Sequence, residues 1–291
     1  MLILLAAAVM ATLPPALTET TTTTAPYSFS VAPDSTAVLF ARARESARDG
    51  RSAEAIRYYL AGARAAGQPA EWDLYRRDLS WVATTAEMKA FGSLGDAARI
   101  DWIRDFWASR DARDGLAAGG RFAEHVRRID IAVAEYAIDP KRGKVPVARG
   151  ANSSGSAFDL TVGAGSPLRD FVPRQGQVDD RGTILIRHGE PDARATAGSG
   201  IESWVYDREE GDNLVVHFSQ NVFDGSSGNT TLIAAPPVPA LEALCGLDSA
   251  SCSVAQRVGG AAPERRERLR QRALAAIREL TTTESAAPRA E

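Results

Sequence analysis

The periodicity of apolar residues changes once along the chain, and this change limits the fold more than any other feature of the sequence. From Asp34 to about Ala137, apolar residues recur at the three- and four-residue spacing of amphipathic helices. After Pro140 this spacing is lost among glycine, serine and proline residues, and short runs of β-branched and aromatic residues follow. We therefore expect an α+β protein in which helical hairpins precede a small antiparallel β-sheet module and a C-terminal helix.

The helical region is expected to span residues 34–140 and to begin with a hairpin. Gly50 separates two apolar stripes, and Ser52 opens the second predicted helix. A single hairpin cannot bury its apolar face alone, so it should stack on a third helix that begins at Pro69. The second helix resembles that of a tetratricopeptide repeat, although Gly62 stands where the repeat has alanine. Such helices are typical of binding or scaffold proteins, which favours a protein partner for the hairpins.

Further apolar stripes predict additional helices up to the change in periodicity. Thr84 with Glu87 has the spacing of a capping box at a helix start. The segment DWIRDFWASRD contains Trp107, Arg110 and Asp111. We expect Trp107 to pack in the core and the Arg110–Asp111 pair to cap, or bridge to, the following helix. A ligand-binding role for this pair is the alternative.

The rest of the chain divides into a linker, a β module and a C-terminal section. Residues 141–170 have the composition of a linker, and residues 171–240 form the predicted β module. Strands are predicted at residues 183–187, 203–206, 214–218 and 230–234. Their spacing suggests an antiparallel meander with helices on one side. Residues 241–291 are expected to hold a disulfide loop and a basic helix from Pro263 to Leu280.

The stretch from Asp180 to Asp192 reads DRGTILIRHGEPD and combines a turn, an apolar run and an acidic exit loop. Together with the Trp-x-x-Arg-Asp segment upstream and the Trp-x-Tyr strand downstream, it resembles the GWxTD-domain family. The signature Trp and Thr of that family are replaced here by Gln177 and Asp179. The resemblance covers roughly residues 85–235 and implies an exported bacterial protein of unknown function, without a settled activity.

The candidate binding residues all lie in this motif and in the strand that follows it. They are Asp180, Arg181, His188, Glu190, Asp192, Trp204 and Tyr206. Asp180 and Arg181 can hold the turn before the apolar run, because Asp accepts backbone hydrogen bonds and Arg can bridge to a neighbouring loop. Trp204 and Tyr206 share one face of a strand, where they are either core residues or a flat recognition surface.

The motif also admits two catalytic interpretations. The words ILIRHGE also resemble the opening of the histidine phosphatases, but that chemistry needs an Arg-lined pocket and a second histidine late in a long α/β domain. His188, Glu190 and Asp192 could ligate a metal on an extended segment, whereas Gly189 and Pro191 favour a turn. We therefore assign no catalytic residue, no metal ligand and no cofactor. A hydrolase using His188 and Glu190, by phosphoryl transfer or metal-assisted hydrolysis, is the alternative.

The first residues, the two cysteines and the net charge indicate the compartment and the kinds of partner. Residues 1–25 contain an apolar run shorter than the roughly 20 residues of a membrane span, which predicts a signal peptide or N-terminal anchor and a periplasmic or secreted protein. An oxidising compartment favours a disulfide between Cys245 and Cys252. The formal net charge of -3 gives no reason to expect nucleic-acid binding. We expect no stable membrane span in the mature chain.

Overall fold

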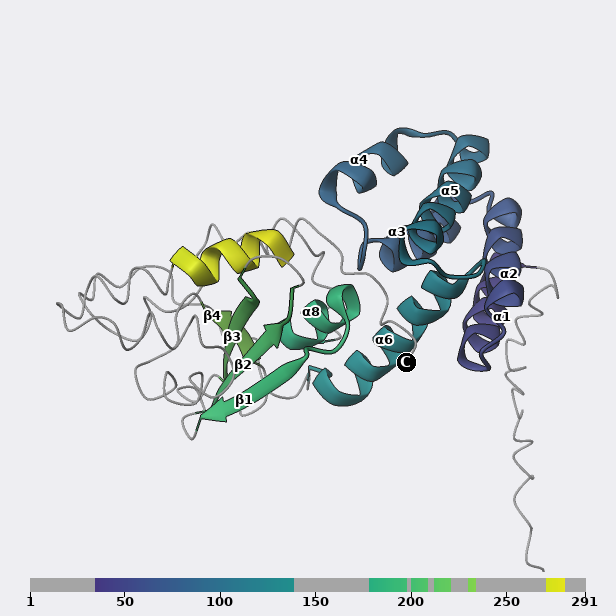
Figure 1. The fold of residues 1–291 in the computed structure, drawn as a ribbon. Coiled ribbons are helices and arrows are strands. Elements are labelled where there is room, and N and C mark those ends of the chain that lie inside the picture. The colour runs from purple at the N-terminus through teal and green to yellow at the C-terminus, as the bar shows by residue number, and fades with distance from the viewer. Residues whose placement is uncertain are drawn as a thin grey trace, which may run out of the picture. The chain divides into compact units, whose positions relative to one another are not determined.

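The structure is a computed structural model, and it describes residues 35–138, 178–197, 200–208, 212–220, 230–233 and 271–280. All of them belong to one unit that begins at Pro33. In these ranges the helices come first, a four-stranded antiparallel sheet follows, and a helix over residues 271–280 comes last (Figure 1). The α+β class is therefore confirmed. The N-terminal segment 1–25, the linker 141–170 and the pair Cys245 and Cys252 lie outside the described residues.

The first six helices are α1 (Thr36–Arg48), α2 (Ser52–Ala65), α3 (Pro69–Leu79), α4 (Thr85–Ser93), α5 (Asp96–Asp114) and α6 (Gly120–Tyr136). Helices α2, α3 and α4 begin where local sequence signals predict, and three further helices complete this part of the chain. The hydroxyl of Thr84 accepts a hydrogen bond from the backbone N–H of Glu87 at 3.2 Å, and the Glu87 carboxylate accepts one from the N–H of Thr84 at 2.7 Å. This reciprocal pair is the predicted capping box.

The predicted hairpin of α1 and α2 turns at Gly50, whose φ of 75° favours glycine. A β-carbon at Gly62 of α2 would lie 2.5 Å from the hydroxyl of Tyr75 and 3.2 Å from Cβ of Leu39. The Tyr75 hydroxyl occupies this position because it donates a hydrogen bond to the carbonyl of Tyr59 at 2.9 Å. The departure from the repeat pattern at Gly62 therefore has a physical cause: the tyrosine fills the space of the alanine methyl group.

A buried carboxylate lies in the core of the helical part. The Tyr59 hydroxyl donates a hydrogen bond to Asp78 at 2.8 Å, and Nε2 of His125 and Nη1 of Arg44 lie 3.4 Å and 3.8 Å from the other carboxylate oxygen. Trp107 is fully buried, as expected, with its ring 5.3 Å from that of His125. Burial acts to raise the pKa of Asp78. The charges and hydrogen bonds of its partners outweigh this effect and hold the pKa below its usual value.

The segment predicted as the first strand, residues 183–187, is instead part of helix α8 (Asp180–His188), so that prediction was wrong. Asp179 caps the helix, because its carboxylate accepts hydrogen bonds from the N–H groups of Arg181 at 2.9 Å and Gly182 at 3.2 Å. Every residue from Gly182 to His188 is buried. A short apolar run that is buried on all sides has no alternation to distinguish a strand from a helix, so its tertiary surroundings decide.

The sheet is the predicted meander. Its strands are β1 (Ala193–Ala197), β2 (Ile201–Tyr206), β3 (Leu214–Gln220) and β4 (Thr230–Ile233), antiparallel in the order β1-β2-β3-β4. Strands β2, β3 and β4 correspond to predicted runs. Strand β1 was not predicted, because its sequence ARATA lacks the bulky β-branched and aromatic residues that mark strands.

Helix α6 connects the hairpin to the β module. It packs against α1 and α2 as well as against α8 (Figure 1). One hydrophobic core contains Tyr59 of α2, Ile184 of α8, Trp204 of β2 and Leu280 of the last helix. The sheet is therefore held to the helical part through buried apolar contacts.

We predict that Asp78→Asn lowers the free energy of unfolding by about 3 kcal/mol near neutral pH, because it removes the partner of buried polar groups. The folded-state pKa lies below the unfolded value of about 3.9. The stability supplied by this carboxylate is therefore complete above that pH and is lost as the pH falls through the folded-state pKa. Urea unfolding of both proteins between pH 2 and 7 measures this difference.

The control for this series is Asp73→Asn, which removes a more exposed carboxylate paired with Arg76 at 2.6 Å. It should change stability by less than about 1 kcal/mol. Equal losses for the two variants, or an unchanged difference from pH 7 to pH 2, would contradict the role of Asp78.

Candidate functional site

The N-terminal end of α8 is fastened to the sheet by its charged residues. Arg181 donates hydrogen bonds to Glu202 of β2 at 2.9 Å and to Asp179 at 2.7 and 3.1 Å. Asp180 accepts one from the backbone N–H of Leu232 in β4 at 2.8 Å. Burial raises the pKa of Asp179, and the guanidinium of Arg181 opposes this rise. Asp180 and Arg181 therefore hold α8 against two strands.

Trp204 and Tyr206 lie on one face of β2, and both side chains are buried. The indole N–H of Trp204 donates a hydrogen bond to Glu202 at 2.6 Å, and its ring lies 5.8 Å from that of Tyr136 in α6. The Tyr206 hydroxyl donates one to the carbonyl of Gly189 at 3.1 Å, and burial raises its pKa. These aromatic residues belong to the core and do not form a flat recognition surface.

His188 ends α8 and is 4% exposed. Its Nε2 lies 2.5 Å from the carbonyl oxygen of Leu280, in the helix over residues 271–280. The next residue, Gly189, has a φ of 84°, and a β-carbon there would lie 3.0 Å from Nη2 of Arg128. His188 thus contacts a helix that lies far away in the sequence, while Gly189 gives the buried arginine room.

The two acidic candidates of the exit loop point to different neighbours. Glu190 is exposed, and its carboxylate lies 3.6 Å from Nη1 of Arg127 in α6. Asp192 accepts a hydrogen bond from the backbone N–H of Asp207 at 2.7 Å, which ties the start of β1 to the end of β2. Asp192 therefore makes a contact between strand ends, and not the local turn contact that its sequence position suggested.

The motif residues are not gathered into one site. Arg181 and His188 lie at opposite ends of α8, about 10 Å apart along its axis at 1.5 Å per residue. In the described part of the chain, no group of three or more His, Cys, Asp or Glu side chains could hold a metal ion. Phosphoryl transfer and metal-assisted hydrolysis both require such residues to converge on one substrate. The structure does not bring Arg181, His188 and Glu190 together in this way.

Sequence reasoning missed a contact between Ser203 and His217, which are directly opposed on β2 and β3. The Ser203 hydroxyl lies 2.9 Å from Nδ1 of His217. Burial and the charge of Arg272 lower the pKa of His217 to about 4, so the imidazole is neutral at physiological pH. A serine on a neutral imidazole resembles half of a nucleophile–base pair. The two residues are only 3% and 4% exposed, so the contact serves the sheet rather than a substrate.

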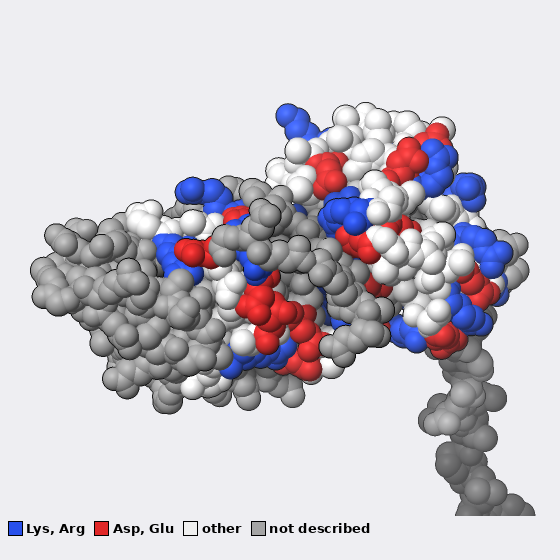
Figure 2. Space-filling model, in the orientation of Figure 1, with Lys and Arg blue, Asp and Glu red and all other residues white. Residues whose placement is uncertain are grey.

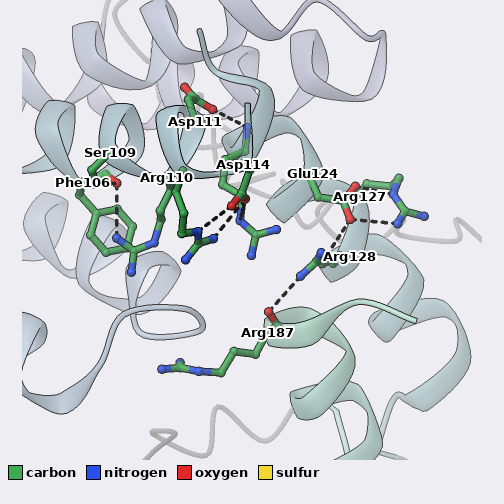
Figure 3. A network of polar contacts seen from close by, with 11 residues as sticks. Phe106, Ser109, Arg110, Asp111, Asp114, Glu124, Arg127, Arg128 and Arg187 are labelled. Atoms are coloured by element: carbon green, nitrogen blue, oxygen red, sulfur yellow. Dashed lines mark hydrogen bonds and ion pairs between the residues drawn. The ribbon is translucent and has the colours of Figure 1, made fainter. Parts of the chain in front are cut away.

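Asp111 caps the following helix, as the sequence suggested, whereas Arg110 bridges to the earlier helix α4. The Asp111 carboxylate accepts hydrogen bonds from the N–H groups of Gly119 and Arg121, both at 2.7 Å, at the start of α6. Arg110 donates to Glu87 at 3.1 Å. Figure 3 shows both side chains leaving α5, with Asp111 directed to the start of α6. Asp111 therefore fixes the turn between α5 and α6, and Arg110 links α5 to α4.

An open groove of about 610 Å³ lies between the end of α1, the α5–α6 turn and α6. Its lining consists of Ala47, Arg48, Gly50, Leu116, Gly120, Ala123, Glu124, Arg127, Asp130 and Ile131. Both arginines are held by acids of α6: Arg48 binds Asp130 at 2.7 and 2.9 Å, and Arg127 binds Glu124 at 2.7 and 3.0 Å. Basic and acidic groups also alternate over the helices in Figure 2. The sequence did not single out these residues, because such pairs are common on solvated helices.

A buried polar network continues from the groove into the β module. Glu124 also accepts a hydrogen bond from Nε of Arg128 at 2.6 Å, and Nη1 of Arg128 donates to the carbonyl of Arg187 at 2.9 Å. Figure 3 shows Glu124 between Arg127 and Arg128, with Arg128 directed at α8. The side chain of Arg187 in turn reaches the carbonyl of Trp81 at 3.3 Å. The wall of the groove is therefore connected to the centre of the fold.

Comparisons of the chain with protein-family models, with curated proteins and with solved structures gave no match. The resemblance to the GWxTD-domain family stays a prediction from the motif. None of the helices in the described ranges is long and apolar enough to cross a membrane.

We predict that His188→Ala loosens the helix over residues 271–280, because it leaves the buried carbonyl of Leu280 without this hydrogen bond. The loss should be about 1–3 kcal/mol. Hydrogen–deuterium exchange in this helix should accelerate, and His188→Gln, which retains a donor, should restore part of the protection. Unchanged exchange in His188→Ala would show that the contact does not hold the helix.

Proposed function

We propose that the chain is a non-catalytic, exported binding or scaffold protein whose helical part receives a protein partner in the groove of α1 and α6. The observation that carries this proposal is the groove itself. It is an open groove with a volume of about 610 Å³. Six small or apolar residues and four charged residues line it.

The contacts of the motif residues support the non-catalytic part of the proposal. His188 is engaged by the carbonyl of Leu280, and Arg181 by two carboxylates. A general base or an anion-binding arginine must instead reach a substrate. These contacts favour a structural role for the motif, and the groove is a separate, accessible surface among the described residues.

The alternative is a hydrolase that uses His188 and Glu190. It requires the two side chains to meet at one substrate, yet His188 is 4% exposed and Glu190 extends towards Arg127. No specific contact favours this function. The experiment that tests the binding function therefore also measures hydrolysis.

The binding function can be tested with a photo-crosslinking residue placed at Ala123 in the groove. The matched control carries the same residue at Ala108, an exposed position of α5 outside the groove. Irradiation in the native host should give a defined adduct only from position 123, and the purified protein should not hydrolyse generic phosphate esters. Equal adducts from both positions, or turnover that is lost in His188→Ala, would overturn the proposal.

Export is part of the proposal and needs its own measurement. Mass spectrometry of the native protein should find a mature N-terminus between about residues 17 and 30, the range in which a signal peptide would be removed. Cys245 and Cys252 should resist alkylation until they are reduced. An intact cytoplasmic chain would refute export, and two freely labelled thiols in an exported protein would refute the disulfide.

A further inference from the structure

We propose that occupancy of the groove is coupled to the β module through Glu124, an acid that lines the groove and also holds the arginine that binds α8. An occupant of the groove should stabilise the end of α8 and the loop that leaves it. This inference rests on the proposed function, because it concerns the regulation of the same groove, and it requires no particular charge on the occupant.

Glu124 is shared between the groove and the centre of the fold. Its carboxylate accepts hydrogen bonds from Arg127 at 2.7 and 3.0 Å and from Nε of Arg128 at 2.6 Å. Arg127 lines the groove, whereas the side chain of Arg128 is 1% exposed and donates from Nη1 to the carbonyl of Arg187 in α8 at 2.9 Å. One carboxylate therefore holds both a groove arginine and a buried arginine in place (Figure 3).

The loop that follows α8 packs against the same two arginines. A β-carbon at Gly189 would lie 3.0 Å from Nη2 of Arg128, and the carboxylate of Glu190 lies 3.6 Å from Nη1 of Arg127. Arg127 thus lies between two acids, one in α6 and one in the exit loop, and it can exchange the first for the second. These two arrangements of Arg127 are the states whose populations an occupant of the groove can shift.

An occupant favours the arrangement in which Glu124 holds both arginines. Burial acts to raise the pKa of Glu124, but the hydrogen bonds and charges of Arg127 and Arg128 outweigh this effect and hold the pKa below its usual value. The group is therefore a carboxylate near neutral pH, and water must replace Arg127 whenever that side chain turns away. An occupant excludes water from the groove and makes this release more costly. Glu124, and with it Arg128, is then held more firmly against α8.

The test places a tethered probe in the groove of the full chain, so it needs no natural partner. Ala123→Cys is labelled with N-phenylmaleimide, peptide mass spectrometry confirms the adduct at position 123, and hydrogen–deuterium exchange is measured over residues 180–192. The label should slow exchange over these residues about fivefold or more, which is a typical size of coupling between two sites. The same label on Ala108→Cys, at an exposed position of α5 outside the groove, should leave this exchange unchanged.

Further variants separate the coupling from general stability. In each variant the labelled protein is compared with the unlabelled one, so a general loss of stability affects both measurements and cancels. Glu124→Gln should abolish most of the effect of the label. Asp101→Asn is the matched control, because it breaks an ion pair of the same i,i+3 spacing with Arg104, at 2.7 Å in α5, and it should retain the full effect.

Glu190→Gln tests the same point without altering a buried contact. It removes the acid that competes with Glu124 for Arg127, so it should slow exchange over residues 180–192 even without the label. The label should then add less than it does in the parent protein. A merely structural role of Glu190 predicts the opposite, because the loss of an ion pair would make exchange faster.

The remaining outcomes distinguish the coupling from the proposed function. Unchanged or faster exchange over residues 180–192 in the labelled Ala123→Cys protein would overturn the coupling, as would an equal effect of the label at position 108. A label effect that persists in full in Glu124→Gln would also overturn it. A photo-crosslinked partner at position 123 together with unchanged exchange would refute the coupling alone. The absence of any such partner would refute the binding function, whatever the label does to exchange.

Discussion

Arg128 places a permanent positive charge where it has almost no contact with solvent, since it is 1% exposed. Moving such a charge out of water costs several kcal/mol unless other groups replace the solvent. Glu124 on the same helix and the carbonyl of Arg187 on α8 supply these contacts. Separating α6 from α8 would take away the carbonyl and return part of that cost. Helix α6 packs against the α1–α2 hairpin, and α8 is bonded to the sheet. The guanidinium of Arg128 therefore helps to hold the helical part and the β module together.

The sequence predicts those elements whose signals are local. The capping box of Thr84, the proline that begins α3 and the glycine between α1 and α2 each act within a few residues, so they mark helix ends correctly. The sequences of strands β2 and β3 alternate apolar and polar residues or contain bulky residues. These signals are also local, and they predict both strands correctly. The prediction failed at α8 because the apolar run Ile184–Leu185–Ile186 is too short to distinguish a strand from a buried helix. Strand β1 failed because its pairing with β2, and not its own residues, makes it a strand.

The candidate site was less predictable for the same reason. The partner of His188 lies 92 residues further along the chain, and that of Arg181 lies 21 residues away. The motif contains histidine, arginine and aspartate, which are common in catalytic sites. The same residue types also make structural contacts, so their presence does not decide between the two roles. The groove draws on α1, the α5–α6 turn and α6, which only the packed structure brings together. A polar motif in a single sequence therefore identifies residues under physical constraint before it identifies a function.

The contact between Gly62 and Tyr75 has a consequence for how sequences of this kind can diverge. The tyrosine hydroxyl sits where a β-carbon at position 62 would be, so alanine does not fit at position 62 while the hydroxyl stays in place. A lineage that acquires alanine at position 62 must first, or simultaneously, lose the hydroxyl at position 75, and then the carbonyl of Tyr59 loses its donor. Substitutions at the two positions are therefore coupled, and their order matters as much as their identity.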